Sequence, residues 1–304
     1  MNNNDMNNVC VVQFLHPGGE HRPTKKQLKN GIQPFGWNFS DHKRKFMKVK
    51  GQYYIDQNNK SQDTDELYFW GEWEPWSNVQ PVLTQNSQGD YPCYIHEPLY
   101  YRDSAKYPQP YGNETKHRQN TDPFVFADQF LYSLCQQNRK TGSTILQSLS
   151  EGSIILFGSC KFKSYFALDT VFVISERKTY SPMSYYKDLV GNIPQHYDKI
   201  MGFNDWPEPD KSQKLVSYKG ASFNKQYKEM YSFVPCKVGV GGMNGFERVK
   251  LTQRELPCIS DKLTQSFKVT PSSISKNIEI WEKIREVVRE QGCLEGVRIF
   301  YSEV

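Results

Sequence analysis

The clearest pattern of hydrophobic positions lies in the middle of the chain. Two apolar runs, 154–157 and 166–174, flank a polar connection that contains Gly158, Ser159 and Ser164. Both runs are short, rich in β-branched and aromatic residues, and bounded by glycine and serine, which is typical of buried strands. The pattern predicts a central pair of strands, entered from a short helix through a turn at Glu151-Gly152.

Further elements are predicted on both sides of this strand pair. Residues 9–15 read as a strand that runs directly into a tight loop, His16 to Pro23. Asp122 and Pro123 carry helix-entry signals and predict a helix through about Arg139. A C-terminal helix is predicted by apolar residues at helical spacing between Thr270-Pro271 and Gly292. Those residues are Ile274, Ile278, Trp281, Ile284 and Val288.

These elements indicate a β-rich α+β fold with a C-terminal helix. Hydrophobic periodicity is poor between Val79 and Asn120, so long loop insertions are expected there. We expect one domain over residues 1–304. The alternative is a subdivision into a basic and aromatic part, 1–118, and a core, 119–304.

Charge is unevenly distributed although the net charge is only +5. From His21 to Lys50 nine basic residues face the single acid Asp41, whereas from Gly51 to Tyr100 eight acids face the single base Lys60. This asymmetry allows a basic, anion-binding face beside an acidic one. Two solvated surfaces that pair with each other would explain the same pattern.

Composition narrows the class of protein. Aromatic residues make up 14% of the chain, which argues against disorder throughout and leaves rings available for stacking. The seven cysteines contain no CxxC pair, the N-terminus lacks a signal-peptide pattern, and no apolar run is long enough to cross a membrane. A cytoplasmic protein with reduced thiols and no membrane association is expected.

The loop after the first strand is the most suggestive local group of polar residues. Glycines and prolines shape it, and a glycine-rich turn at a strand end lets the backbone approach a ligand closely. His16, Glu20 and His21 could contact an anion, transfer protons or bind a metal, although the spacing matches no recognised zinc motif. Hydrogen bonding within the turn is the alternative explanation.

A second candidate segment, Asn38 to Lys45, follows closely enough to share that site. Phosphate recognition requires cationic donors, and Asn38 could read a base edge or a ribose. A charged helix face exposed to water would have the same composition. Together with the preceding loop, this segment supplies Arg22, Asn38, His42, Lys43, Arg44 and Lys45 as candidate nucleotide-binding residues.

Aromatic residues and carboxylates could provide the base-binding part of the site. Trp70 and Trp73 could stack on a base while Glu72 accepts hydrogen bonds from it, as in pockets that hold an extruded base. Core packing accounts for the tryptophans equally well. Asp169 interrupts an apolar strand and needs a buried partner, so it either stabilises the fold or belongs to a site.

Motifs for specific chemistries are largely missing from the sequence. His96 and Cys93 have the spacing of half a zinc site, but no second half is visible, and His96 remains a candidate for acid–base chemistry. Ser159 lacks the GxSxG context of a nucleophile, and the chain contains no P-loop or GxGxxG motif. No metal site is predicted, and any cofactor stays unknown.

The central stretch resembles the β-barrel of the PUA-like superfamily, which includes the EVE, ASCH and YTH domains. The likeness lies in Leu146, Leu149 and Glu151-Gly152-Ser153, followed by runs 154–157 and 166–174, and covers about thirty residues. It implies a PUA-like barrel core and a protein that binds nucleic acid. Several members hold a flipped modified base, but the aromatic cage residues cannot be carried over to this chain.

Three functional hypotheses follow. The first is a binding protein that recognises nucleic acid or a modified nucleotide through a basic and aromatic pocket. The second is a hydrolase of nucleotides or nucleic acid that uses His16, Glu20, His21 and His96 as acid–base groups. The third is a protein-interaction module that uses the two oppositely charged faces, with another protein as its partner.

Overall fold

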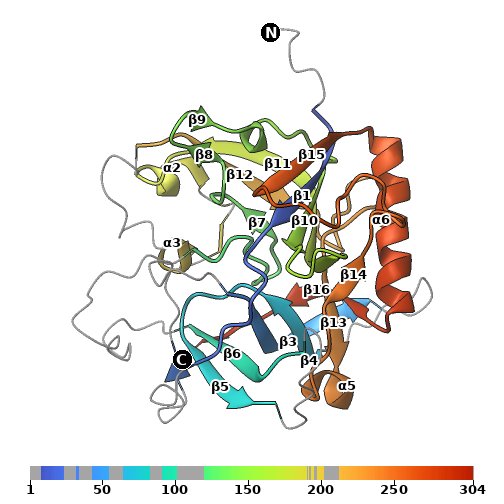
Figure 1. The fold of residues 1–304 in the computed structure, drawn as a ribbon. Helices are drawn as coiled ribbons and strands as arrows, with labels where there is room; N and C mark the ends of the chain where they lie inside the picture. Colours follow the sequence, from blue (N-terminus) through green and yellow to red (C-terminus); the bar gives the residue numbers. More distant parts are fainter. Residues whose placement is uncertain are drawn as a thin grey trace, which may run out of the picture.

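The fold was analysed in a computed structural model of the chain. It describes residues 8–23, 32–33, 43–54, 64–82, 91–100, 120–189, 191, 193–194, 197–201 and 212–303. Most of the loop insertions expected between Val79 and Asn120 lie outside these residues. In the described part, two large sheets and a long C-terminal helix form a β-rich α+β fold, as predicted (Figure 1).

The first sheet is built around the predicted central strand pair. Its order is β15 (Phe267–Pro271), β1 (Cys10–Leu15), β10 (Ile154–Ser159), β11 (Phe166–Tyr180), β12 (Leu215–Gly220) and β7 (Leu131–Tyr132). A seventh strand, β14 (Val249–Leu251), pairs with β11. β1 runs parallel to β10, whereas β10 and β11 are antiparallel. The predicted strands at 9–15, 154–157 and 166–174 are therefore confirmed.

The second sheet contains strands from both ends of the chain. Its order is β16 (Leu294–Ile299), β13 (Val234–Val238), β4 (Asp65–Gly71), β3 (Lys45–Tyr54), β6 (Tyr94–Tyr100), β5 (Ser77–Pro81) and β2 (Ile32–Gln33). The eighth strand, β17 (Ser302–Glu303), pairs with β6. β16 also pairs with β3, so that β3, β4, β13 and β16 close a small antiparallel barrel.

The closed barrel is built from other strands than those for which the sequence indicated a barrel. β10 and β11, which carry the resemblance to PUA-like domains, lie in the first sheet. An apolar run records that a strand is buried, but it contains no information on which strand is its partner. The barrel strands are more amphipathic, and their closure depends on pairing between residues more than 200 positions apart.

Two hydrophobic clusters explain why β10 is apolar at every position. Ile155 and Phe157 pack between the two sheets, together with Val12 and Phe14 of β1. Ile154 and Leu156 point the opposite way, into a cluster with Trp281 and Ile284 of the C-terminal helix. Because alternate residues of a strand face opposite sides, a strand covered on both faces loses the usual alternation of polar and apolar residues.

The C-terminal helix α6 (Ile274–Glu290) lies along one side of the molecule, against β14 and β16 (Figure 1). The side chain of Ser273 accepts the N–H of Lys276 and caps its first turn, and Gly292 adopts a positive φ of 71° just beyond its end. The predicted helix is confirmed, but it begins later than expected, because Thr270-Pro271 are the last residues of β15. The short helices are α2 (Tyr185–Leu189), α3 (Tyr197–Met201) and α5 (Gly239–Met243).

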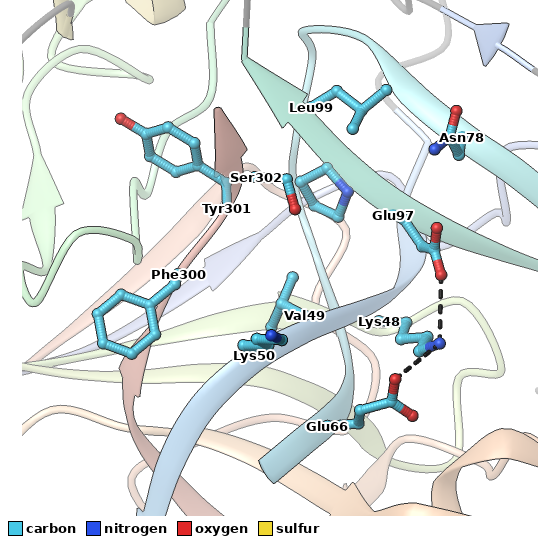
Figure 2. A pocket seen from close by; sticks show the side chains of 11 residues that line it. Lys48, Val49, Lys50, Glu66, Asn78, Glu97, Leu99, Phe300, Tyr301 and Ser302 are labelled. Atoms are coloured by element: carbon cyan, nitrogen blue, oxygen red, sulfur yellow. Dashed lines mark ion pairs between the residues drawn. The ribbon is translucent and has the colours of Figure 1, made fainter. Parts of the chain in front are cut away.

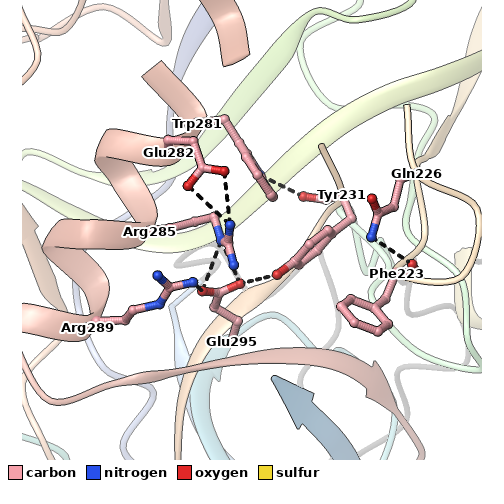
Figure 3. A network of polar contacts seen from close by, with 8 residues as sticks. All are labelled: Phe223, Gln226, Tyr231, Trp281, Glu282, Arg285, Arg289 and Glu295. Carbon is pink, nitrogen blue, oxygen red and sulfur yellow. Dashed lines mark hydrogen bonds and ion pairs between the residues drawn. The ribbon is translucent and has the colours of Figure 1, made fainter. Parts of the chain in front are cut away.

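A buried ionic network joins α6 to β16 (Figure 3). The carboxylate of Glu295 accepts hydrogen bonds from Arg285 Nε at 3.0 Å, from Arg289 Nη2 at 2.7 Å and from the hydroxyl of Tyr231. The Arg285 guanidinium also lies over the ring of Trp281, at 4.4 Å. A buried carboxylate is tolerated when donors surround it in this way.

The helix predicted from Asp122 to about Arg139 is absent. This segment forms turns, β7 and β8 (Asn138–Arg139), which pairs with β9 (Gly142–Ser143). Ala127 and Asp128 adopt positive φ angles of 56° and 60°, which a right-handed helix does not allow. The carboxylate of Asp122 satisfies the N–H groups of residues 133–135 across a turn, so the helix-entry signal serves a different structure.

Candidate functional site

The loop of residues 16–22, named here the His16 loop, connects the two sheets. The backbone N–H of His16 donates to Gly158 of β10 at 2.7 Å, which ties the start of the loop to the first sheet. Further on, Arg44 N donates to the carbonyl of Gly19, and His21 N donates to the carbonyl of Arg44, both at 2.8 Å. The loop therefore pairs with the start of β3 in the second sheet.

Close packing requires a glycine at position 18 of the His16 loop. A Cβ atom on Gly18 would lie 2.2 Å from the Ser159 hydroxyl and 2.6 Å from Cβ of Lys161, which is closer than real atoms approach. Gly19 lies beside the side chain of Lys43, with its hypothetical Cβ 3.6 Å away. The loop thus passes between Lys161, which follows β10 of the first sheet, and Lys43, which precedes β3 of the second.

Glu20 and Arg22 have different roles although they are an ion pair. The buried carboxylate of Glu20 accepts the N–H groups of Cys93 and Tyr94, at 2.5 and 2.9 Å, which fixes the loop to the start of β6. Arg22 Nε lies 3.1 Å from Glu20, yet its side chain is 65% exposed. Glu20 therefore positions the loop, and Arg22 remains accessible to an external anion.

His21 and His96 are neighbours in the buried interior. Their ring centroids lie 5.6 Å apart, and His96 is fully buried. Burial lowers the pKa of His96 well below its usual value, and the nearby positive charges of Lys45 and His21 lower it further. His96 is thus neutral near pH 7. His16 packs against Phe157, with ring centroids 5.6 Å apart, and is not part of this pair.

Arg44 and Lys45 are buried and face different partners. Arg44 Nη2 forms an ion pair with Glu72 at 3.0 Å, and Lys45 Nζ donates to the carbonyl of Trp73 at 2.5 Å. Burial lowers the pKa of Lys45 to about 7, against the opposing effect of Glu74 and Glu72. The candidate segments that contain Arg44, Lys45 and Glu72 therefore come together, but they do so in the interior and not at the surface.

Residues that the site prediction did not include complete this buried group. Glu74 accepts the N–H of Asn120 at 2.7 Å, and its own N–H donates to Thr121. Burial raises the pKa of Asp122 to about 7, although its hydrogen bonds to residues 133–135 oppose the shift. The sequence offered Glu74, beside Glu72, as an acceptor for a base, and Asp122 as an acid–base group or a helix cap, and the structure buries both.

The two tryptophans lie in different hydrophobic clusters. Trp73 packs against Phe126 at 4.8 Å and donates its ring N–H to the carbonyl of Trp76, whereas Trp70 donates to the carbonyl of Phe246. Trp70 lies in β4, whereas Trp73 follows the end of that strand. Both rings are buried. Stacking of a base on either ring stays a prediction.

Asp169 has the buried partner that the sequence required. Arg248 Nε lies 3.5 Å from Asp169, the guanidinium of Arg248 lies over the ring of Trp70 at 4.5 Å, and its Nη2 donates to the carbonyl of Gly18. Arg248 was not predicted. Arg248 directly precedes β14, which pairs with β11 beside Asp169, and this non-local pairing is not visible in the local sequence.

Cations and aromatic rings come together on the surface beside the His16 loop. The turn between β10 and β11, residues 160–165, stacks Phe162 on Tyr165 with ring centroids 5.3 Å apart and an interplanar angle of 26°. Lys161 lies over Phe162 at 4.9 Å, and Lys250 of β14 lies over Tyr165 at 5.2 Å. Lys161 is exposed and both rings are partly exposed.

We name this feature the loop–turn surface. It consists of Arg22, Lys43, Lys161, Phe162, Tyr165 and Lys250. Gly18 contacts Lys161 on one side and Gly19 approaches Lys43 on the other, so the surface is continuous with the His16 loop. Asn38 and His42 lie outside the described residues. Partly exposed rings flanked by lysines are suited to stack on bases and contact phosphates.

Other classes of site receive no support from the described ranges. Within them, no three side chains of the His, Cys, Asp or Glu types come together to hold a metal ion. No helix there has the length and apolar character needed to span a bilayer. Comparisons with protein families, with curated proteins and with solved structures find no match for this chain.

Proposed function

We propose that the protein binds single-stranded nucleic acid on the loop–turn surface. The observation that carries the proposal is the stacked pair Phe162 and Tyr165, with a lysine over each ring. Aromatic rings stack on bases of any sequence, and neighbouring cations contact the backbone phosphates. Lys161 and Lys250 can turn from the ring faces to phosphates, because an exposed cation–π contact is worth only about 0.5–1 kcal/mol. Lys250 also forms a partly exposed ion pair with Glu247 at 2.8 Å, and such a pair contributes at most about 1 kcal/mol.

The proposal assigns different roles to the predicted nucleotide-binding residues. Arg22 and Lys43 are direct phosphate contacts, and Asn38 and His42 remain predicted contacts just before Lys43. Arg44, Lys45 and Glu72 hold the start of β3 in place behind them. Trp70, Trp73 and Asp169 support the same strands from within.

The fold supports this class of function only by analogy. The closed barrel of β3, β4, β13 and β16 agrees with a likeness to PUA-like domains, which commonly bind nucleic acid. A fold by itself does not define a function, since sites differ among proteins that share it. The loop–turn surface lies outside that barrel, at the end of the β10–β11 pair.

Removal of the two rings tests the proposal. We expect the double variant Phe162→Ala, Tyr165→Ala to bind a labelled single-stranded oligonucleotide at least roughly 5-fold more weakly in fluorescence anisotropy titrations, because each stacked base contributes about 1–3 kcal/mol. The matched control is Tyr186→Ala on α2, where a 65% exposed tyrosine also contacts a second ring, Tyr185.

Unchanged binding by the double variant, or an equal loss in Tyr186→Ala, would refute the loop–turn surface as the binding site. Urea unfolding of each variant separates loss of binding from loss of fold. Product release from the oligonucleotide or from a nucleotide panel would instead favour the hydrolase hypothesis. In that case His21→Ala should abolish turnover, because His21 and His96 are the two buried imidazoles that lie together.

A further inference from the structure

A pocket opens in the second sheet where β6 diverges from β3. The two strands pair at Phe46 with Ile95 and at Met47 with His96. Beyond this point β3 pairs with β16, and β6 pairs with β17. The space between them has a volume of about 240 Å³ and is bordered by residues 300–302, with the N–H of Phe300 bonded to the carbonyl of Lys50 (Figure 2).

The polar groups of this pocket balance in charge. Lys48 Nζ lies 2.9 Å from Glu66 and 3.3 Å from Glu97, and Lys50 adds a second ammonium group. Figure 2 shows Lys48 between the two carboxylates, with Phe300 and Tyr301 towards the opposite side. The hydrogen bond to Glu66, and secondly that to Glu97, raises the pKa of Lys48, so Lys48 remains charged.

Both carboxylates keep capacity for a ligand. Glu66 and Glu97 have side chains that are 49% and 36% exposed. Each ionised carboxylate offers about four acceptor positions, of which Lys48 occupies one in each and the Tyr68 hydroxyl a second in Glu66. Asn78, which is exposed on β5, adds an amide that both donates and accepts. The pocket can therefore accept hydrogen bonds from amino groups and donate to ring acceptors.

The remaining walls are apolar and suit a flat ring. Val49, Pro98 and Leu99 are buried and line the pocket. A volume of about 240 Å³ is below the roughly 300–1,000 Å³ of pockets for drug-sized ligands, so a ligand of nucleoside size is the upper limit. A free phosphate would meet two carboxylates, and a metal ion would meet two ammonium groups, so neither matches this set of charges.

We propose that this pocket binds a nucleobase that carries an exocyclic amino group. Glu97 and Glu66 accept from the amino group, Asn78 pairs with the ring edge, and the ring lies against the apolar wall. The base comes either from a free nucleoside or from an unpaired position of the nucleic acid held on the loop–turn surface. This inference rests on the proposed function, because the pocket lies in the second sheet, whose strand β3 begins just after Lys43 of the loop–turn surface.

Saturation-transfer NMR with free nucleosides tests the pocket without involving phosphate contacts. We expect adenosine, cytidine or guanosine to bind more tightly than uridine, which lacks an exocyclic amino group, with an affinity that does not change between low and high salt. Glu97→Gln should weaken the preferred nucleoside roughly 10-fold. The control is Glu279→Gln on α6, a 66% exposed carboxylate in a salt bridge far from the pocket in sequence.

A second variant keeps the test independent of folding. Asn78→Ala leaves the ion pairs of Lys48 intact, and it should also weaken the preferred nucleoside. No binding of any nucleoside, equal binding of uridine, or wild-type affinity in both variants would overturn the proposal. An oligonucleotide arm identifies the source of the base, because Glu97→Gln then weakens an adenine homopolymer more than a uracil homopolymer.

The two binding proposals fail separately. If nucleosides do not bind while an oligonucleotide binds in a salt-dependent manner, the pocket proposal is wrong and the loop–turn surface stands. If nucleosides bind and oligonucleotides do not, the loop–turn surface is wrong and the pocket stands as a site for free nucleosides. A change of oligonucleotide affinity in Phe162→Ala, Tyr165→Ala without a change in nucleoside affinity supports two distinct sites.

Discussion

Adjacent basic residues in this protein have opposite environments. Lys43 is partly exposed beside Gly19, whereas Arg44 and Lys45 are each only 1% exposed. Successive residues of a strand point to opposite faces, and both faces of β3 are covered near its start. The run Lys43-Arg44-Lys45 therefore supplies one surface cation and two interior ones, and only the first can meet an external phosphate without a structural change.

Lys45 should make the stability of the fold depend on pH. Its pKa in the folded state is about 7, below its usual value of 10.5, so between these pH values the unfolded chain binds more protons than the folded one. The cost of the buried ammonium is fully present below pH 7 and is relieved as the pH rises towards 10.5. The slope contributed by one such group is at most about 1.4 kcal/mol per pH unit.

The substitution Lys45→Met tests this assignment. Across pH 7 to 9.5, wild-type stability measured by urea unfolding should rise relative to the variant, because methionine has no ionisable group. The comparison between the two proteins cancels the titration of groups that do not interact with Lys45. A difference that stays constant over this range would mean that the folded and unfolded chains bind the Lys45 proton equally, so that burial does not lower its pKa.

The sequence indicated which segments lie close together better than it indicated their burial. It named His21, Arg44, Glu72, Trp73 and His96 as candidates from separate segments, and the structure brings these residues together around the starts of β3 and β6. Burial was not predictable, because it depends on which segments cover each face of the sheet, and those segments are remote in sequence. The loop–turn surface was missed because Phe162 and Tyr165 were treated as part of a connecting turn.

At the level of elements, local signals predicted strands and helices where packing agreed with them. The apolar residues at helical spacing in α6, its cap Ser273 and Gly292 beyond its end all favour a helix, and the helix forms. The segment after Asp122 carried an equally good entry signal, yet its carboxylate caps a turn 11 to 13 residues further on. Such a contact is not visible in local sequence. Barrel closure by β16 and β3 is non-local for the same reason.

The network around Glu295 should be a main support for the docking of α6. We expect Glu295→Gln to lower the free energy of unfolding by about 3 kcal/mol, because it leaves the buried charge of Arg285 with only the half-exposed Glu282 as a carboxylate partner. Urea unfolding followed by tryptophan fluorescence measures this loss, and Trp281 on α6 lies against the affected guanidinium.

Glu282→Gln provides the matched control on the same helix. Glu282 also pairs with Arg285, at 3.1 Å, but its side chain is 52% exposed, so its loss should change stability by less than about 1 kcal/mol. Equal effects of the two substitutions would show that the buried network does not anchor the helix.

At the scale of the whole molecule, the two sheets share one charged surface where they meet. The His16 loop leaves the first sheet after β1 and pairs with β3 of the second, which places Lys161 and Lys43 on either side of it. The net charge of +5 provides a favourable long-range field for a polyanion. Strands from both sides of residue 118 pair in both sheets. The surface is therefore assembled from segments that are distant in the sequence.

The salt dependence of oligonucleotide binding tests the central claim most directly. The logarithm of the binding constant should fall linearly with the logarithm of salt concentration, and each lost phosphate contact on a single strand should reduce the slope by about 0.7. The account predicts this reduction for Lys161→Gln and for Lys43→Gln. Lys178→Gln, which removes an exposed lysine at the other end of β11, should keep the wild-type slope. Identical slopes in all four proteins would contradict the account.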